Sequence, residues 1–303
     1  MKPLKKIWMS GKFVSWKNAT VHILTHAIHY GTAIFEGIRC YDTKNGPAIF
    51  RLKDHYSRLL KGANAYQFEV KYSIDELCEI TKEVVRKNNV KSCYIRPICY
   101  VGNKLIGLSL EGAPFEFAII PVDFDSLFKN KDGIKAKISS WKRINTTILS
   151  PHVKASANYL NSVLAKKEAV DDGYDEAIML ADSGHVAEGS GENIFIVRDE
   201  KLITPPLHDS ILGGITRESV IEIAKEMGIR VEEKTILRDE LYSADEAFFC
   251  GTAAEITPIA EIDRRKISKS VGKITKEIQE TYSNVVRAKD ERFIKWLSFI
   301  NTD

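Results

Sequence analysis

Two ionisable side chains stand in contexts where each could do chemistry. Lys154 precedes a run of small residues at 155–157. Such a lysine is usually exposed, but it acts as a nucleophile where its surroundings lower its pKa. Glu188 lies between an expected strand and the glycine turn at 189–191, and by residue type it is a surface carboxylate. Hydrophobic periodicity does not separate the catalytic from the structural interpretation of either residue.

Two glycine-associated segments have the composition of anion sites. Gly213 and Gly214 lead into a helix expected to begin near Thr216, where N–H groups and the helix dipole favour a phosphate. Gly251 and Thr252 end a β-rich run among small residues, which let backbone amides approach an anion. Each segment is equally compatible with an ordinary turn.

The histidines and cysteines do not predict a metal site. His22 and His26 would share a helical face, but Ile23 stands where a zinc protease needs glutamate. The better interpretation is that these histidines are structural. The five cysteines are odd in number and form no Cys-x-x-Cys pair, so neither a zinc site nor a disulfide framework is expected, and a reducing cytoplasm fits best.

Size and charge limit the function classes. The chain has 303 residues, 44% of them hydrophobic, which favours two domains. Lysine plus arginine number 44 against 41 acidic residues, and the net charge of +3 is too small to indicate a nucleic-acid or membrane partner. No apolar run approaches the roughly 20 residues of a membrane helix, and no signal peptide is expected.

The elements that must position these residues follow from periodicity and turn signals. A hairpin is expected around Asn45-Gly46-Pro47, between strands at 37–41 and 48–51. Helices are predicted at 53–65 and from Ser73, which begins a capping box, to 88–89. Strands are predicted at 92–101 and 115–122. Together they form a small α+β domain over 1–120, followed by an interdomain loop at 121–133.

The rest of the chain, 134–303, is predicted to form a larger domain in which strands and helices alternate. Helices are expected at 156–171, 216–227 and 272–288, with Gly228 at a helix C-cap. Strands are expected near 134–140, 175–181, 193–197, 201–204, 229–236, 245–250 and 256–262.

Seven segments occur in one characteristic order, and with them the chain resembles the branched-chain amino acid aminotransferases, which are fold-type IV pyridoxal-phosphate enzymes. Each segment alone would be weak evidence, but the series is specific because it extends over most of the chain. The segments are 26–31, 35–41, 94–97, Lys154 with Asn158-Tyr159, 188–193, 214–217 and 251–255.

The resemblance implies a two-domain fold of mixed α+β and α/β type and a cofactor, pyridoxal 5′-phosphate, held by the large domain. It implies ping-pong amino transfer between L-leucine, L-isoleucine or L-valine and 2-oxoglutarate. Lys154 would form the Schiff base and carry the proton, Glu188 would meet the pyridine nitrogen, and Tyr159 would bind the 3′ oxygen. The implied cofactor residues are Arg58, Lys154, Tyr159, Glu188, Leu212, Gly214, Ile215, Thr216, Gly251 and Thr252.

The implied substrate pocket has an apolar wall, an α-carboxylate site on backbone amides and a site for the γ-carboxylate of glutamate at Arg96 and Tyr94. Tyr30 and Leu108 would reach the active site of a neighbouring subunit, which implies a homodimer or a higher homo-oligomer. The implied substrate residues are Tyr30, Phe35, Gly37, Tyr94, Arg96, Leu108, Phe124, Thr252 and Ala253.

One part departs from the family pattern. Bacterial relatives carry large aromatic residues in the interdomain loop, where this chain has Val122 and Asp125, with Ser126 beside them. Phe124 and Phe128 are the aromatic residues available for a lid. D-amino-acid aminotransferases and aminodeoxychorismate lyases would share Lys154 and Glu188 and stay open as alternatives, as does a binding protein that kept the fold without the cofactor.

Overall fold

The computed structural model describes residues 2–103, 106–124, 127–128, 133–267 and 271–300, and contacts between Cα atoms divide it into two units. The first unit comprises Met1–Asp125, Val153–Ala157 and Val285–Asp303. The second comprises Ser126–His152 and Asn158–Asn284. The chain therefore crosses between the units more than once.

This division differs from the expected ranges at two segments inside 134–303. Val153–Ala157 belongs to the first unit because Ala155 forms a β-bridge with Ile34. The C-terminal segment belongs there because β18 (Leu297–Phe299) pairs with β6 (Ala48–Phe50). Both attachments join residues that are far apart in the sequence. The expected domain ranges followed changes in composition along the chain, and such changes do not show long-range pairing.

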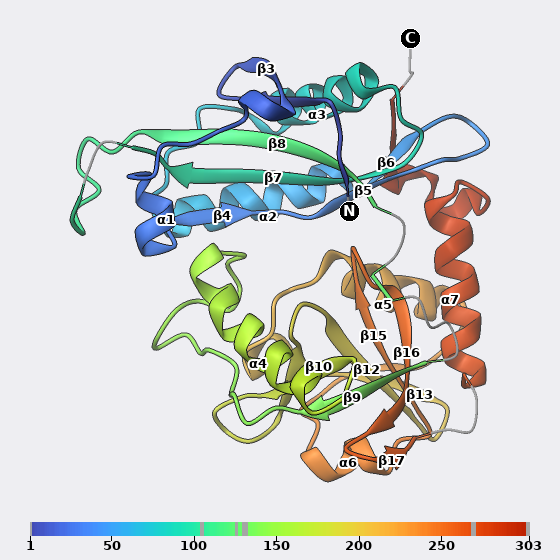
Figure 1. Ribbon diagram of the computed structural model, residues 1–303. Coiled ribbons are helices and arrows are strands. Elements are labelled where there is room, and N and C mark those ends of the chain that lie inside the picture. Colours follow the sequence, from blue (N-terminus) through green and yellow to red (C-terminus); the bar gives the residue numbers. More distant parts are fainter. Residues whose placement is uncertain (1, 104–105, 125–126, 129–132, 268–270, 301–303) are drawn as a thin grey trace. The chain divides into compact units, whose positions relative to one another are not determined.

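The first unit is built on an antiparallel sheet in the order β18-β6-β5-β7-β8-β2-β3 (Figure 1). Strands β1 and β4 pair with β8 and β7 beside this path. The expected hairpin and strands are confirmed. The remaining strands are β1 (Lys2–Pro3), β2 (Lys6–Met9), β3 (Lys12–Ser15), β4 (Ala33–Phe35), β5 (Ile38–Tyr41), β7 (Cys93–Val101) and β8 (Phe115–Asp123).

Strand β8 continues into the segment expected to be the interdomain loop. Pro121 pairs with Ile95, and Val122 pairs with Tyr94 on β7. The predicted loop start at residue 121 is therefore wrong, because the ladder to β7 holds the backbone extended through two more residues. Proline is compatible with a strand position where no N–H is needed.

Two long helices, α2 (Leu52–Ala65) and α3 (Ile74–Asn88), complete the core of the first unit. Their expected positions are confirmed. Ser73 and Glu76 form the predicted capping box, and Asn89 ends α3 in the left-handed conformation with a φ of 51°. The helices bury Tyr56, Leu59 and Leu77 against the sheet, while the short helix α1 (His26–Tyr30) precedes β4.

The second unit contains a mixed sheet in the order β11-β10-β9-β16-β15-β12-β13-β14, with β17 beside β16 (Figure 1). The pairs of β9 with β10 and β16 and of β13 with β14 are parallel. Strand β11 was not predicted, and β14 is shorter than its expected range. The strands are β9 (Ile134–Ile138), β10 (Glu176–Leu180), β11 (Val186–Gly189), β12 (Asn193–Arg198), β13 (Lys201–Thr204), β14 (Val231–Glu233), β15 (Glu246–Gly251), β16 (Glu255–Ile262) and β17 (Arg265–Lys266).

Helices α4 (Tyr159–Asp171), α5 (Ile215–Glu226) and α6 (Arg238–Tyr242) lie in the second unit, and α7 (Lys273–Val286) ends in the first. Predictions for α4, α5 and α7 are confirmed, whereas α6 was not predicted. Within the described ranges, no helix is both long and apolar enough to span a bilayer.

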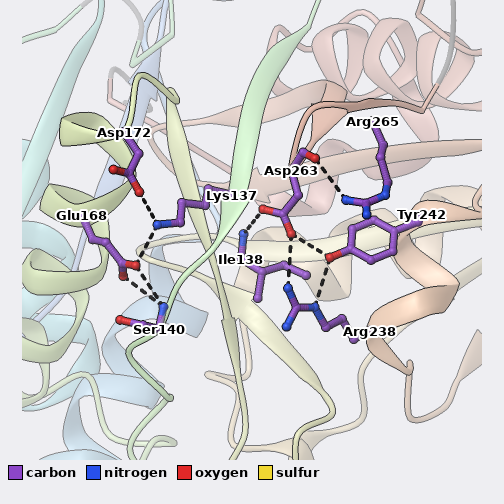
Figure 2. Close-up of polar contacts among 9 residues, drawn as sticks. All are labelled: Lys137, Ile138, Ser140, Glu168, Asp172, Arg238, Tyr242, Asp263 and Arg265. Carbon is purple, nitrogen blue, oxygen red and sulfur yellow. Dashed lines mark hydrogen bonds and ion pairs between the residues drawn. The ribbon is translucent and has the colours of Figure 1, made fainter.

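Two polar networks flank β9 (Figure 2). On one side, Lys137 Nζ lies 2.8 Å from Glu168 on α4 and also contacts Asp172, the C-cap residue of that helix. On the other side, the Asp263 carboxylate accepts hydrogen bonds from the Tyr242 hydroxyl at 2.7 Å and from the β9 backbone at 3.0 Å. These contacts attach α4 and α6 to β9, so the charged side chains in both networks have a structural role.

Candidate active site

Lys154 lies in a short extended segment of the first unit. The Phe35 N–H donates a hydrogen bond to the Lys154 carbonyl at 3.0 Å, and Ala155 bridges to Ile34. Lys154 Nζ lies 5.3 Å from the centre of the Phe35 ring. The segment is held by its backbone, so the amine has a defined position beside an aromatic face.

The expected substrate residues Phe35, Gly37, Tyr94 and Arg96 form one cluster. Tyr94 and Arg96 are two residues apart on β7, which places them on the same face of the strand. Arg96 Nη2 donates to the Tyr94 hydroxyl at 2.9 Å, and its guanidinium lies 4.6 Å from the Phe35 ring centre. A Cβ at Gly37 would lie 2.0 Å from the Tyr94 hydroxyl oxygen, so a side chain there would displace Tyr94.

Phe124 joins this cluster from the end of β8. Its ring centre is 5.6 Å from that of Tyr94 and 5.4 Å from the Arg39 guanidinium carbon, and the side chain is buried. Asp125 and Ser126, which were expected to contribute to the lid, lie outside the described residues. Phe124 therefore packs on Tyr94, one of the two residues expected to meet the γ-carboxylate.

Tyr30 and Leu108 are more exposed than the residues of this cluster. The Tyr30 hydroxyl accepts a hydrogen bond from the Gly107 N–H at 3.2 Å, and the Tyr30 ring packs on His26. Leu108 is 84% exposed and Tyr30 is 38% exposed. His26 is buried and bonded to Thr32 and the Gly107 carbonyl, as expected for a structural histidine.

Arg58 is positioned on α2 by a buried carboxylate. Its Nε and Nη2 donate to the two Glu36 oxygens at 2.7 and 2.8 Å, and His55 Nδ1 lies 2.8 Å from the same carboxylate. Burial by itself would raise the pKa of Glu36, but the charge of Arg58 and the His55 hydrogen bond outweigh it and hold the pKa well below its usual range. Glu36 is therefore ionised.

Glu188 lies on β11 of the second unit at the centre of a network of hydrogen bonds. Its Oε1 accepts from Arg143 Nε at 2.8 Å, and its Oε2 accepts from Asn193 Nδ2 and the Leu212 N–H, both at 3.0 Å. The Arg143 Nη1 atom is buried without a hydrogen-bond partner among the described residues. Glu188 is not the surface carboxylate that its residue type indicates, since it is only 5% exposed.

The first turn of α5 lies beside this network. Gly214 is the N-cap of α5, and no side chain in the described part of the chain caps the helix there. A Cβ at Gly214 would lie 1.9 Å from the Asn193 Oδ1 atom, so glycine lets Asn193 reach both Glu188 and the Leu212 carbonyl. The buried Ile215 and Thr216 N–H groups are therefore near the Glu188 network.

The second glycine-associated segment is brought to the same region. Gly251 ends β15, and Thr252 and Ala253 form the turn before β16. Asn193, at the start of β12, pairs with Cys250 on β15, so this turn follows directly from the strand beside Asn193. The structure thus brings together two of the proposed anion-binding segments within the second unit.

Tyr159 is the first residue of α4 and is half-buried. Asn158 before it donates from Nδ2 to the Ser150 carbonyl at 2.9 Å. This bond fixes the start of α4, and hence the position of Tyr159 within the second unit.

A further buried carboxyl group, Glu192, lies close to Glu188 in the sequence. Its Oε2 accepts the Gly191 N–H at 3.1 Å. Burial, followed by the negative charges of Glu176 and Glu188, raises the pKa of Glu192 to about 8 against the opposing effects of the Gly191 N–H and Lys166. Glu192 is therefore neutral at pH 7.

Five residues that contact the predicted site were assigned no role from the sequence: Glu36, His55, Arg143, Glu192 and Asn193. Three of them stand inside the segments that carry the family resemblance. His55 could have been found by its spacing of three from Arg58 on a predicted helix, which places both on one face. Arg143 stands in no recognisable pattern.

Comparisons with known proteins agree on one family. The model of the class IV amino-transferase family matches residues 33–262. A branched-chain-amino-acid aminotransferase from Pseudomonas aeruginosa is 43% identical over 298 residues, which cover 97% of each chain. Two solved branched-chain aminotransferases superpose over nearly the whole chain. The Thermoproteus uzoniensis structure with norvaline has a TM-score of 0.95 and 46% identity, covering 98% of this chain and all of that one. The Thermobaculum terrenum structure in its PLP form has a TM-score of 0.93 and 40% identity, covering all of both chains.

Proposed function

Because the chain belongs to the class IV aminotransferase family, we propose that it is a branched-chain-amino-acid aminotransferase. Its reaction transfers the amino group between L-leucine, L-isoleucine or L-valine and 2-oxoglutarate, giving the branched-chain 2-oxo acid and L-glutamate. The relatives support this assignment by their names and by the length over which they match.

The observation that carries the substrate class is the cluster of Phe35, Tyr94 and Arg96. A branched-chain aminotransferase must accept an apolar side chain and the γ-carboxylate of glutamate in one pocket. Phe35 supplies an apolar surface, and the Arg96 guanidinium lies on its face while bonded to the Tyr94 hydroxyl. Arginine suits a carboxylate because its planar fork matches the two oxygens. The Thr252 and Ala253 amides would hold the α-carboxylate.

The residues of the second unit fit pyridoxal 5′-phosphate. The start of α5 has a glycine N-cap and no side-chain cap within the described residues, so its N–H groups suit a phosphate. Glu188 accepts hydrogen bonds from Arg143, Asn193 and the Leu212 N–H, as suits a carboxylate that stays ionised beside the cofactor. These hydrogen bonds hold the Glu188 carboxylate in one orientation, in which it would face a protonated pyridine nitrogen. Leu212 would lie against the ring.

Glu188 would hold the proton on the pyridine nitrogen at one of its carboxylate oxygens. Arg143, Asn193 and the Leu212 N–H keep this carboxylate in one orientation. Tyr159 would bind the cofactor's 3′ oxygen. When bound, the cofactor supplies an electron sink that makes the substrate Cα proton acidic.

Lys154 would anchor the cofactor covalently through Nζ and then carry the proton away from the substrate Cα. A lysine suits both tasks because its neutral amine is a base and its ammonium form is an acid. Arg58, the Ile215 and Thr216 amides and the Thr252 hydroxyl would bind the phosphate.

A second copy of the chain is the proposed partner. Large apolar side chains are exposed along one segment of the first unit, at Trp16, Val21, Ile23, Leu24, Ile28 and Tyr30. An adjoining hollow of about 420 Å³ is lined mainly by apolar residues, among them Ile98 and Ile120. An apolar surface of this kind marks an interaction site. In the proposed homodimer, Tyr30 and Leu108 reach the partner's active site.

The visible spectrum of the purified protein tests this function. We expect the absorbance of the bound cofactor to change when L-leucine or L-glutamate is added, and to stay constant with D-alanine. A response to D-alanine alone would indicate a D-amino-acid aminotransferase. Release of pyruvate from aminodeoxychorismate would indicate the lyase, and a protein that stays colourless with added cofactor would exclude all three activities.

A further inference from the structure

Glu36 is a fully buried carboxylate between β4 and β5 that has no role in the function proposed above. Its backbone is fixed because the Glu36 N–H donates to the Pro97 carbonyl on β7 at 2.9 Å. Its Oε2 also accepts the Gly37 N–H at 3.3 Å. The carboxylate therefore extends from the sheet at a defined point, next to the predicted substrate residue Gly37.

The partners of Glu36 come from one face of α2. His55 and Arg58 are three residues apart on this helix, so their side chains project in the same direction. Both are bonded to the Glu36 carboxylate, and His55 is buried. Burial is the largest influence on His55 and lowers its pKa. The hydrogen bond and negative charge of Glu36 raise this pKa, and the smaller effects of the Arg58 and Lys154 charges lower it, so that the net shift is downward. A neutral His55 donates its Nδ1–H and leaves Arg58 as the cation of the cluster.

The pairing geometry orients the guanidinium. Glu36 accepts the Nε–H and one Nη2–H, which together form the side edge of the Arg58 guanidinium. The end edge, formed by Nη1 and the other Nη2–H, points away from Glu36 because the group is planar. That edge has the spacing that binds two oxygens of a phosphate. Arg58 itself is partly accessible, with 17% of its side chain exposed, whereas Glu36 has no exposed surface.

We propose that Glu36 is a positioning residue that locks Arg58 with its end edge directed at the cofactor phosphate. This inference rests on the proposed function, in which Arg58 binds that phosphate. Glu36 does not touch the phosphate, and its own negative charge would repel it. Its benefit is that it removes the rotational freedom of a long side chain before the cofactor binds, which lowers the cost of binding.

The test measures the affinity of the apoprotein for pyridoxal 5′-phosphate and for pyridoxal, which lacks the phosphate. We expect Glu36→Gln to weaken binding of the phosphorylated form by about tenfold or more, which corresponds to about 1.4 kcal/mol. Binding of pyridoxal should change by less than about threefold, since only the phosphate meets Arg58. Equal losses for both compounds would overturn the proposal, because they would indicate a general distortion of the site.

A double-mutant cycle with Arg58→Met separates the positioning role of Glu36 from the phosphate-binding role of Arg58. If Glu36 acts through Arg58, adding Glu36→Gln to Arg58→Met should cause no further loss of phosphate-dependent affinity. Additive losses would overturn the role of Glu36 while leaving Arg58 in the phosphate site. If Arg58→Met alone leaves the affinity for pyridoxal 5′-phosphate unchanged, Arg58 does not bind the phosphate, and the proposed function is wrong on this point.

Two further variants keep the test decisive. Asp54→Asn disrupts another arginine–carboxylate pair, between the N-cap residue Arg51 and Asp54 in the first turn of α2, and should leave both affinities unchanged. Glu36→Asp keeps the charge but shortens the side chain, so it replaces Glu36→Gln if the amide variant does not fold. The aspartate variant should also lose more affinity for pyridoxal 5′-phosphate than for pyridoxal. Full wild-type affinity for pyridoxal 5′-phosphate would contradict the proposal.

Discussion

Single charged residues in this protein owe their expected behaviour to a few close neighbours. Lys154 has a fixed backbone and an aromatic ring beside its amine. Arg96 has a hydroxyl partner and the same ring. Glu192 has two carboxylates nearby. For each of these three residues, the surrounding groups predict the effect of a single substitution.

Lys154→Ala should lose the covalent link to the cofactor and reduce turnover by several orders of magnitude, because nucleophile and proton carrier are removed together. Borohydride reduction of the wild-type protein followed by peptide mapping should label Lys154. Lys142→Ala, which removes an exposed lysine paired with Asp182, should retain activity. A label on another lysine would contradict the assignment.

Arg96→Leu should separate the two substrate classes. A buried carboxylate that loses its partner costs about 3–5 kcal/mol, so activity with glutamate and 2-oxoglutarate should fall far more than activity with leucine. The measurement is kcat/KM for each substrate. A parallel decrease for leucine and glutamate would show that Arg96 does not meet the γ-carboxylate.

Glu192→Gln should change how stability depends on pH. The folded protein keeps the Glu192 proton up to a pKa of about 8, whereas the ordinary value is 4.5, so unfolding releases a proton between these values. The contribution of Glu192 to stability therefore falls as pH rises from about 4.5 to about 8. A glutamine cannot ionise, so the variant should gain in Tm relative to wild type at pH 8 more than at pH 5. An equal difference at both pH values would mean that Glu192 is ionised in the folded protein.

At the scale of elements, strand β8 determines what the following segment can do. The ladder to β7 holds residues through Val122, and Phe124 then turns onto Tyr94 and Arg39. A ring anchored on both sides forms a fixed wall, so the chain positions one large apolar group beside the predicted pocket without the aromatic residues that bacterial relatives place in the loop.

Phe124→Ala should therefore lower kcat/KM for leucine more than for glutamate, because only an apolar side chain gains from the lost surface. A methylene in a pocket contributes about 1–3 kcal/mol even in a tight fit, so we also expect modest discrimination among leucine, isoleucine and valine and measurable activity with aromatic substrates. Phe128→Ala is the matched control, since Phe128 contacts Lys166 in the second unit. If both variants behave like wild type, another part of the chain or the partner subunit forms the wall.

At the scale of the whole molecule, the single chain leaves a group of large apolar side chains uncovered between Trp16 and Tyr30. Tyr30 and Leu108 are exposed on the first unit, and the Tyr30 hydroxyl is bonded to Gly107, the residue before Leu108. The proposed active site, completed by a second copy, would account for both observations.

We expect the purified protein to be a dimer or a larger assembly of dimers by light scattering. Ile28→Glu should shift it toward the monomer and reduce activity together with assembly, because a buried unpaired charge is costly. Leu237→Glu replaces an equally accessible apolar residue outside this segment, 48% exposed against 54% for Ile28, and should not change the mass. A monomeric wild-type protein with full activity would refute the proposed partner.

The sequence by itself determined most helices and strands and the family. Capping at Ser73, helical spacing in α2 and the glycines before α5 depend on neighbours a few residues away, so one-dimensional patterns contain them. Local patterns did not assign roles to Lys154 and Glu188; the order of the seven family segments did, and these roles remain predictions.

The tertiary structure alone decided the surroundings of these residues. Arg143 reaches Glu188 across 45 positions, Glu36 meets Arg58 across 22, and Ala155 joins the first unit through a bridge to Ile34. Such contacts depend on how distant segments pair, and no local preference specifies them. The burial of a side chain and the charges around it set its pKa, and both depend on the three-dimensional environment. For this reason only the tertiary structure indicates a neutral Glu192 and an oriented Arg58.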